Sequence, residues 1–427
     1  MLSLDAMTSA NGGVVPSRLS RRLGTFDAVI IGLGAMIGAG VFAALGPAAR
    51  AAGNGLLIGL LLAAFVAYCN ATSSAQLAAI YPESGGTYVY GRMRLGPFVG
   101  YLAGWAFVVG KLASCSAMAL TFGYYASPEL ARPLAVGAVL ALAAVNYFGV
   151  QKTAALTKVI VALVLASLAV VVCAALLGGQ ADADRITPLV EDDYDLTGIL
   201  QAAGLLFFAF AGYARIATLG EEVANPRTTI PRAIPIALGV TLLVYGTVAI
   251  ASIAAIGSQG LAQAGAPLTA VVKAGDLSEL APVVRVGATV ASLGVLLSLM
   301  VGISRTLFSM AANGDMPRVF DHVHPRYKVP DHAEVAVAAC VALVVMFVDV
   351  RGAIGFSSFG VLLYYGIANA CAITLNASER RSPRVLAIAG VIGCVVLALS
   401  LPWESIAIGV AVVAVGVLAY VVRRVKL

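Results

Sequence analysis

Charged side chains are scarce in this sequence. Asp, Glu, Lys and Arg make up 11% of its 427 residues, whereas 60% are hydrophobic. Soluble domains carry roughly 25% charged residues, so this composition excludes an ordinary soluble protein. Apolar runs of about 20 residues, the length of a membrane-spanning helix, recur from Phe26 almost to the C-terminus. A β-barrel is excluded as well, because its strands would alternate over about 10 positions. The sequence therefore predicts an all-α polytopic membrane protein.

Motifs that catalyse reactions or hold metals are also lacking. None of the six cysteines forms a Cys-x-x-Cys pair, so we expect small apolar core residues and no disulfide or metal site. The stretch from Gly104 to Lys111 fails as a phosphate-binding loop, because its glycine spacing is wrong and Leu112 replaces the required Ser or Thr. The three histidines fall in one loop and are interpreted as loop residues. We expect neither an enzyme nor a cofactor.

The apolar runs divide into twelve predicted spans. With the N-terminus in the cytoplasm, 19 of the 27 Lys and Arg residues lie on the cytoplasmic side and six lie outside, as the positive-inside rule requires. This asymmetry accounts for the net charge of +6 without a nucleic-acid partner. We expect a plasma-membrane protein with both termini in the cytoplasm. The predicted spans are 26–47, 55–80, 97–126, 132–150, 153–178, 197–220, 232–257, 282–311, 333–350, 354–376, 385–401 and 404–422.

Two of these spans contain interruptions. Residues 32–42 read Gly-Leu-Gly-Ala-Met-Ile-Gly-Ala-Gly-Val-Phe, although each glycine costs about 1 kcal/mol in a helix interior. Residues 207–213 interrupt the sixth span with Phe-Phe-Ala-Phe-Ala-Gly-Tyr. Five spans separate the starts of the two, so the breaks lie in helices of opposite direction, as in inverted-repeat secondary transporters. The expected parts are a cytoplasmic N-terminal segment (1–25), a first repeat of five helices (26–178), a second repeat of five (197–376), two C-terminal helices (385–422) and a cytoplasmic tail (423–427).

Some of these features also have a purely structural interpretation. The Gly34-x-x-x-Gly38 spacing could serve helix packing by small residues. Lys111 and Arg215 are the two cations within predicted spans, and intramembrane cations usually mark functional sites. Either side chain could instead have a structural role. Lys111 could snorkel or bind a carbonyl group, and Arg215 could bind carbonyl groups in a water-filled vestibule. We name Lys111 as a candidate for proton or cation coupling, and Arg215 as a candidate for recognising a carboxylate.

Four sequence motifs are spread over nearly the whole chain. They are 34–42 (Gly-Ala-Met-Ile-Gly-Ala-Gly-Val-Phe), 82–90 (Pro-Glu-Ser-Gly-Gly-Thr-Tyr-Val-Tyr), 220–226 (Gly-Glu-Glu-Val-Ala-Asn-Pro) followed by Ile230-Pro231, and Ser304-Arg305 with 310–317 (Met-Ala-Ala-Asn-Gly-Asp-Met-Pro). In this order they resemble the amino acid–polyamine–organocation (APC) superfamily of permeases. The resemblance implies a LeuT-type fold and transport of amino acids or related amines without ATP hydrolysis.

The resemblance also implies where the substrate binds. The first break would offer backbone N–H groups to the α-carboxylate, and the second would offer carbonyls to the α-ammonium, with Phe208 as an aromatic gate. The residues agree with this chemistry, because a half-helix N-terminus has free N–H groups and a half-helix C-terminus has free C=O groups. The predicted site comprises Met36, Ile37, Gly38, Ala39 and Gly40 in the first break and Phe208, Ala209, Phe210, Ala211 and Gly212 in the second.

The expected function is secondary transport of an amino acid or small amine across the lipid bilayer by alternating access. Proton symport is the preferred coupling, and Na⁺ is less favoured. Some members of the family carry a lysine midway along the fifth helix in place of sodium. Here Lys158 lies too near the cytoplasmic start of that span, and Val164 is nearer the expected depth. A membrane-embedded amino acid sensor and an uncoupled exchanger or facilitator are the alternatives, and the substrate and oligomeric state stay open.

Overall fold

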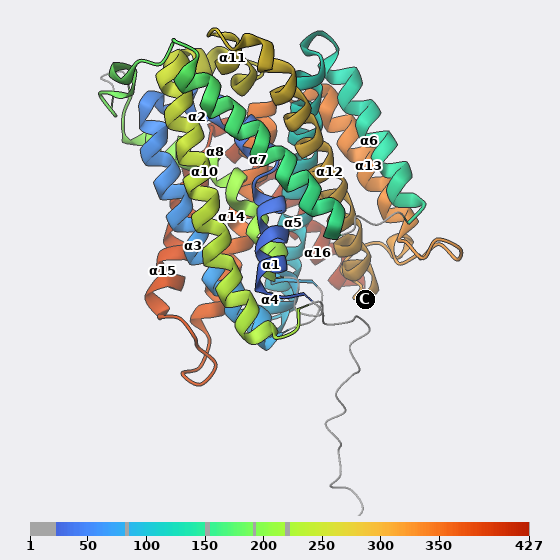
Figure 1. The fold of residues 1–427 in the computed structure, drawn as a ribbon. Coiled ribbons are helices and arrows are strands. Elements are labelled where there is room, and N and C mark those ends of the chain that lie inside the picture. The colour runs from blue at the N-terminus through green and yellow to red at the C-terminus, as the bar shows by residue number, and fades with distance from the viewer. Residues whose placement is uncertain (1–22, 82–84, 150–153, 191–193, 218–222, 427) are drawn as a thin grey trace, which may run out of the picture.

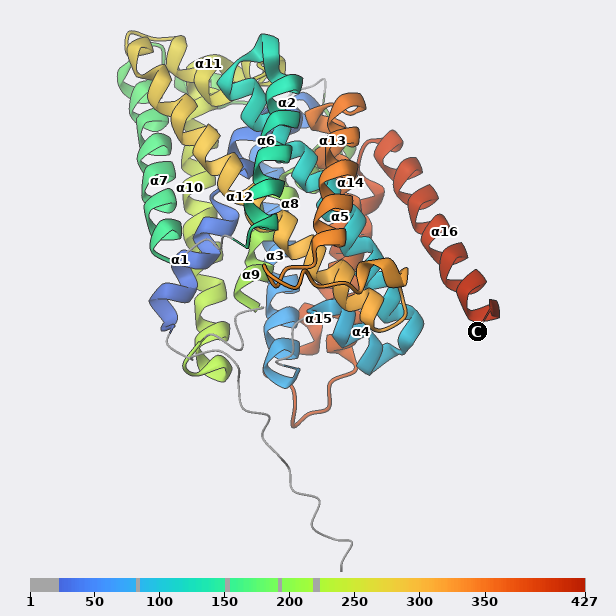
Figure 2. The same cartoon turned by 90° about the vertical axis from the view of Figure 1, so that its right-hand side faces the viewer.

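Helices form nearly all of the regular structure in the computed structural model (Figure 1, Figure 2). The structure describes residues 23–426 apart from 82–84, 150–153, 191–193 and 218–222, so most of the predicted N-terminal segment lies outside the described residues. The α-helices are α1 (Thr25–Met36), α2 (Ala39–Ala52), α3 (Leu56–Ile80), α4 (Thr87–Leu95), α5 (Pro97–Ala126), α6 (Ala131–Tyr147), α7 (Ala154–Leu177), α8 (Leu196–Phe210), α9 (Ala214–Ala217), α10 (Pro226–Gln263), α11 (Pro267–Lys273), α12 (Ala281–Ala312), α13 (Asp331–Phe347), α14 (Val350–Ile373), α15 (Arg384–Leu399) and α16 (Trp403–Lys426).

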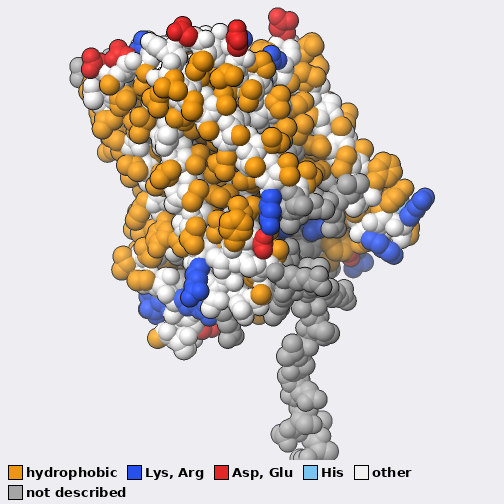
Figure 3. All heavy atoms as spheres, viewed as in Figure 1, with side chains coloured by type: hydrophobic (Ala, Val, Ile, Leu, Met, Phe, Trp, Pro, Cys, Tyr) orange, Lys and Arg blue, Asp and Glu red, His pale blue; other side chains and the backbone are white. Residues whose placement is uncertain are grey.

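The helices have the length and surface of a membrane protein. Nine helical segments of the described chain could cross a bilayer by length and composition, and Thr25–Met36 and Arg384–Leu399 are shorter apolar helices. Apolar side chains cover a broad middle band, while Asp and Glu gather mostly at the upper edge and Lys and Arg mostly toward the lower edge (Figure 3). The prediction of an all-α polytopic membrane protein is confirmed. The twelve predicted spans coincide largely with helices, but twelve crossings and a 5+5 repeat stay predictions.

Two connections between predicted spans contain helices of their own, α4 and α11. These have nine and seven residues, too few to cross a bilayer, so apolar runs in the sequence do not reveal them. Gly86 and Gly96 set the ends of α4, with φ values of 56° and 101°. Residues with a side chain rarely adopt such values, so glycine lets the chain turn sharply into and out of this helix.

The cysteines do not all occupy the core. Cys69, Cys115, Cys371 and Cys394 are buried, as expected, and none of the six cysteines forms a disulfide. Cys173 and Cys340, however, are exposed, on α7 and α13. The expectation of core positions is wrong for these two, because each lies on a helix face that points away from the bundle.

The interrupted spans lie in the interior of the bundle. Helix α5 packs against α12 and α14, while α2 and α3 both pack on α8, and α10 packs on α1. Helix α16 stands at the edge (Figure 2) and exposes apolar side chains such as Val415 and Leu418. Neighbouring helices on several sides therefore hold the two breaks, so their backbone groups are screened from lipid.

Candidate substrate-binding site

The first span is interrupted among its glycines. Helix α1 ends at Met36 and α2 begins at Ala39. Ile37, with ψ 55°, and Gly38, with φ −109° and ψ −139°, leave the helical conformation between them. The interruption is therefore two residues long, within the wider segment that the glycines indicated.

The second interruption is a tightened turn. Helix α8 continues to Phe210, past the predicted start of the break at Phe207, and one 3₁₀ turn at Ala211–Tyr213 leads into α9. Of the predicted site residues, 208–210 thus lie in the last turn of α8, and 211–212 lie in the 3₁₀ turn. The segments 82–84 and 220–222, which carry part of the family resemblance, lie outside the described residues.

The two interruptions meet backbone to backbone. A Cβ atom added to Gly40 would lie 2.7 Å from the Cα atom of Ala209. A Cβ atom added to Gly212 would overlap the carbonyl group of Ala35. Real Cβ atoms essentially never come closer than 3.0 Å to such neighbours, so only glycine fits at both points. The structure therefore brings together residues that the sequence places about 170 positions apart in two predicted breaks.

Two buried tyrosines bind carbonyl groups of the breaks. The hydroxyl of Tyr245, on α10, donates to the carbonyl oxygens of Met36 and Ala209, at 2.5 and 3.2 Å, and so bridges the two breaks. The hydroxyl of Tyr365, on α14, donates to the carbonyl oxygen of Ala211 at 3.0 Å. Each carbonyl oxygen has a second lone pair for a further donor. Sequence reasoning missed both tyrosines, although a tyrosine within an apolar span needs a buried partner for its hydroxyl.

The donors at the first break come from the first turn of α2. An α-helix leaves the N–H groups of its first turn without an acceptor inside the helix, and they carry the positive end of its dipole. In α2 these groups include those of Ala39 and Gly40. The N–H groups of Ile37 and Gly38 instead donate to carbonyls of the chain just before them, at 2.6 and 2.7 Å. In this conformation the N–H groups that can donate to a ligand therefore include those of Ala39 and Gly40, but not those of Ile37 and Gly38.

The glycines of the first break also permit close helix packing. A side chain at Gly38 would overlap Val295 of α12, and a Cβ atom at Gly34 would lie 2.9 Å from the side chain of Thr157 on α7. Gly34 and Gly38 therefore both allow neighbouring helices to pack closely, which is the structural alternative proposed for these two glycines. Gly40 differs, because its neighbour is the backbone of the second break.

The two cations within predicted spans have different surroundings. Lys111, on α5, is buried, with 8% of its surface exposed. One turn further along α5, the hydroxyl of Ser114 hydrogen-bonds to that of Ser357 on α14 at 2.6 Å. Arg215 is exposed on α9, directly after the 3₁₀ turn of the second break. The structure thus keeps Lys111 in the core and places Arg215 at the surface near the site.

An ion pair lies at the start of α1, and a cavity lies along α2. At the start of α1, Asp27 forms an ion pair with Lys158 of α7, at 2.8 Å. Beyond Gly40, along α2, lies a cavity of about 160 Å³. Val164, predicted to lie nearer than Lys158 to the depth of the lysine in some family members, is fully buried. The cavity lining includes Phe42, Tyr125, Arg50, Asp349 and Arg351.

Nearly the whole chain is similar to known transporters. A family model described as amino acid permease matches residues 27–425. The chain is 61% identical over 411 residues to an uncharacterised transporter of Mycobacterium tuberculosis, covering 96% of this chain and 93% of that protein. It is 26% identical over 436 residues to a branched-chain amino acid permease of Bacillus subtilis, covering 95% and 92%. It is 25% identical over 412 residues to cationic amino acid transporter 4 of Homo sapiens, covering 89% and 64%.

Proposed function

Because this chain belongs to the amino acid permease family, we propose that it is a secondary active transporter that moves amino acids or related small amines by alternating access. The family and the names of its relatives indicate a transporter and not an enzyme. The observation that carries the proposal is the backbone contact between the interrupted helices at Gly40 and Ala209. That contact sets the N–H groups that begin α2 beside the carbonyl groups that end α8.

A zwitterionic amino acid needs both kinds of backbone group. The start of α2 offers N–H groups and about half a positive charge to an α-carboxylate. The end of α8 offers carbonyls, including that of Ala209, to an α-ammonium group. Backbone recognition of this kind does not depend on the substrate's side chain, so selectivity must come from other residues. Arg215 is our candidate for that role, because it follows the second break directly.

Alternating access requires one end of the site to open while the other closes. The cavity along α2 supports a path to the site from one side, and the Asp27–Lys158 pair supports closure on the other. Only Ile37 and Gly38 connect α1 to α2, so α1 could move away from α7 while α2 stays packed on α8. We assign the ion pair to the closed state of the side on which α1 begins.

We also propose the membrane in which the protein lies and the ion gradient that drives transport. The chain would lie in the plasma membrane with both termini in the cytoplasm, because that orientation follows the positive-inside rule. Inward proton flow would drive uptake, with Lys111 as the candidate coupling residue, since a cation buried in a membrane protein is costly and usually functional. Sodium coupling is less favoured, and no cofactor is proposed.

Uptake into proteoliposomes tests the proposal. The labelled substrates should include branched-chain and cationic amino acids, because similar proteins carry those names. We expect saturable uptake that an inward proton gradient stimulates and that Gly40→Val abolishes, while the matched variant Gly239→Val retains it, because nothing lies within 4 Å of a Cβ atom there. Gradient-independent uptake would indicate an uncoupled exchanger or facilitator and remove proton coupling. Binding without uptake would indicate a sensor, and no binding or uptake of any amino acid or amine would overturn the proposal.

A further inference from the structure

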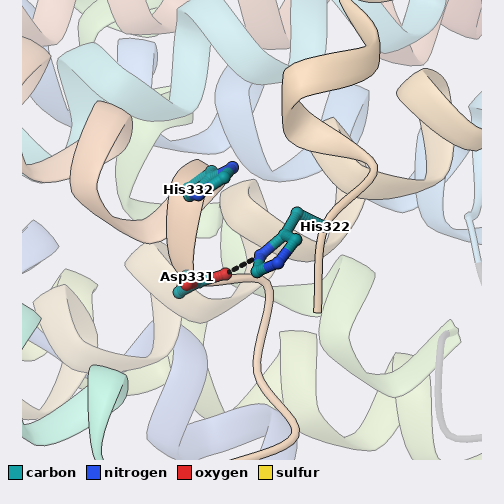
Figure 4. A group of neighbouring side chains, drawn as sticks. All are labelled: His322, Asp331 and His332. Atoms are coloured by element: carbon teal, nitrogen blue, oxygen red, sulfur yellow. Dashed lines mark hydrogen bonds and ion pairs between the residues drawn. The ribbon is translucent and has the colours of Figure 1, made fainter. Parts of the chain in front are cut away.

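Three side chains with metal-binding atoms lie together in the connection between α12 and α13. His322 follows the short 3₁₀ helix Arg318–Phe320, and Asp331 and His332 open α13. One potential ligand atom from each residue lies within 4.8 Å of the other two. Figure 4 shows the His332 ring at the start of α13 and the His322 ring on the segment before it, with a hydrogen bond between Asp331 and His322. We refer to these three residues as the His322 cluster.

Hydrogen bonds fix the tautomers of both imidazoles. Nδ1 of His322 lies 2.7 Å from a carboxylate oxygen of Asp331, and Nδ1 of His332 lies 2.8 Å from the carbonyl oxygen of Val319. A carbonyl or a carboxylate can only accept, so each Nδ1 carries the hydrogen. In the neutral ring Nε2 therefore keeps the lone pair that binds metals. His332 has the arrangement that is usual for a metal-binding histidine, which donates its other ring N–H to a backbone carbonyl or a carboxylate.

Burial makes the carboxylate a favourable partner for a cation. Asp331 is 7% exposed, and a buried carboxylate needs charge or hydrogen-bond compensation. The side chain of His322 is 45% exposed, and His332 is exposed as well. The cluster therefore combines one anionic oxygen held by the fold, a His332 ring held by the carbonyl of Val319, and an exposed His322 ring that can rotate.

The distances allow a metal after a small adjustment. Ligand atoms around a tetrahedral ion with bonds of about 2.1 Å lie about 3.4 Å apart. The three ligand atoms lie within 4.8 Å of one another, so their separations must shorten by at most about 1.4 Å. The two imidazoles now stack, with ring centroids 4.3 Å apart and planes inclined by 15°. Rotation of the exposed His322 side chain opens this stack, gives up its hydrogen bond to Asp331, and turns the ring so that both residues face a shared ion.

We propose that the His322 cluster binds one divalent transition-metal ion, with Zn²⁺ as the representative. Two imidazole nitrogens and one carboxylate suit Zn²⁺ and its neighbours better than Mg²⁺ or Ca²⁺, which prefer all-oxygen sites. Three protein ligands leave a fourth position for water. The ion ties the segment after the 3₁₀ helix to the first turn of α13. One turn further on, Glu334 accepts a hydrogen bond from Ser304 of α12, so the ion restrains a connection that already joins α12 to α13.

Zinc titration of the purified protein tests this site independently of transport. The full-length chain, with a tag that contains no histidine, is titrated with Zn²⁺ in competition with a chromogenic chelator. We expect one Zn²⁺ per chain. His322→Ala and His332→Ala should each bind at least about tenfold more weakly, since even outer partners of metal ligands contribute about 10–100-fold.

His324→Ala is the matched control, because His324 lies in the same connection but outside the cluster. Its Nδ1 accepts from the backbone N–H groups of Arg326 and Tyr327. We expect this variant to bind Zn²⁺ like the wild type. His332→Gln, together with the visible absorption of bound Co²⁺, keeps the test decisive if an alanine variant unfolds. The proposal is overturned if the wild type does not bind saturably, or if His324→Ala weakens binding as much as His332→Ala does.

Discussion

Replacing Gly40 by alanine tests whether the two interruptions meet as described. The added Cβ atom would lie 2.7 Å from Cα and 2.8 Å from Cβ of Ala209, whereas ordinary contacts begin at 3.4 Å. Because the neighbour is helix backbone, no change of rotamer relieves the overlap. Helices α2 and α8 must therefore separate by about 0.7 Å, the difference between 2.7 and 3.4 Å.

The size of the effect follows from two opposing contributions. Overpacking costs about 1–3 kcal/mol, while alanine gains about 1 kcal/mol over glycine in a helix. Gly239 on α10 supplies the matched control, since nothing lies within 4 Å of a Cβ atom added there. Gly239→Ala has the helix gain without an overlap that opposes it. The free energy of unfolding should therefore be lower in Gly40→Ala than in Gly239→Ala by about 1–3 kcal/mol.

Unfolding and ligand binding, measured in the same detergent, provide the two readouts. We expect Gly40→Ala to melt below Gly239→Ala. We also expect it to bind its amino acid about tenfold more weakly, which corresponds to the loss of one good hydrogen bond at about 1.4 kcal/mol. Equal melting temperatures and equal affinities for the two variants would refute the backbone contact. A lower melting temperature with unchanged affinity would keep the contact but place the ligand elsewhere.

Three further changes test other parts of the molecule. Tyr245→Phe removes the hydroxyl that bridges the two breaks. The free energy of unfolding should fall by about 1–3 kcal/mol, because buried carbonyls lose a donor, and an unchanged denaturation curve would speak against the bridge. Lys111→Met keeps an unbranched side chain of similar length but removes its charge, so gradient-driven uptake should drop to the gradient-free level while substrate binding persists. Unaltered gradient dependence would exclude Lys111 from coupling. A hydrogen bond from Arg94 holds the pKa of Glu379 below its usual value, so the stability gained from this pair is present above about pH 4.3 and is lost as the pH falls through the folded-state pKa. The melting difference between wild type and Glu379→Gln should therefore shrink on acidification, and a difference that does not vary with pH would contradict this reasoning.

The positions of the two interruptions could be predicted from the sequence, but their extent could not. Glycines cluster over residues 32–42, yet only Ile37 and Gly38 leave the helical conformation. The second break begins after Phe210 and not at Phe207. Both differences have one cause: unpaired backbone groups inside a membrane protein are costly, so helical hydrogen bonds persist wherever the chain can form them.

The side chains that bind the carbonyl groups of the two breaks could not be predicted from the sequence. Tyr245 reaches a carbonyl oxygen 209 positions away in the chain, at Met36. No local pattern states which helix will lie beside α1. The histidines are a second example, because the loop interpretation gave no reason to pair His322 with His332, whereas the structure stacks their rings.

By itself the sequence determined the class of this protein: apolar helices that form a polytopic membrane protein, two of them interrupted, with the motifs of a permease family. The helices and their interruptions follow from composition and from the cost of unpaired backbone groups in lipid, which are local, whereas the family follows from the resemblance of the motifs. Only the tertiary structure decided that Gly40 meets Ala209, that one tyrosine bridges both breaks, and that a carboxylate lies beside two imidazoles. These contacts join segments far apart in the chain, and side-chain shape across packed helices determines which of them form.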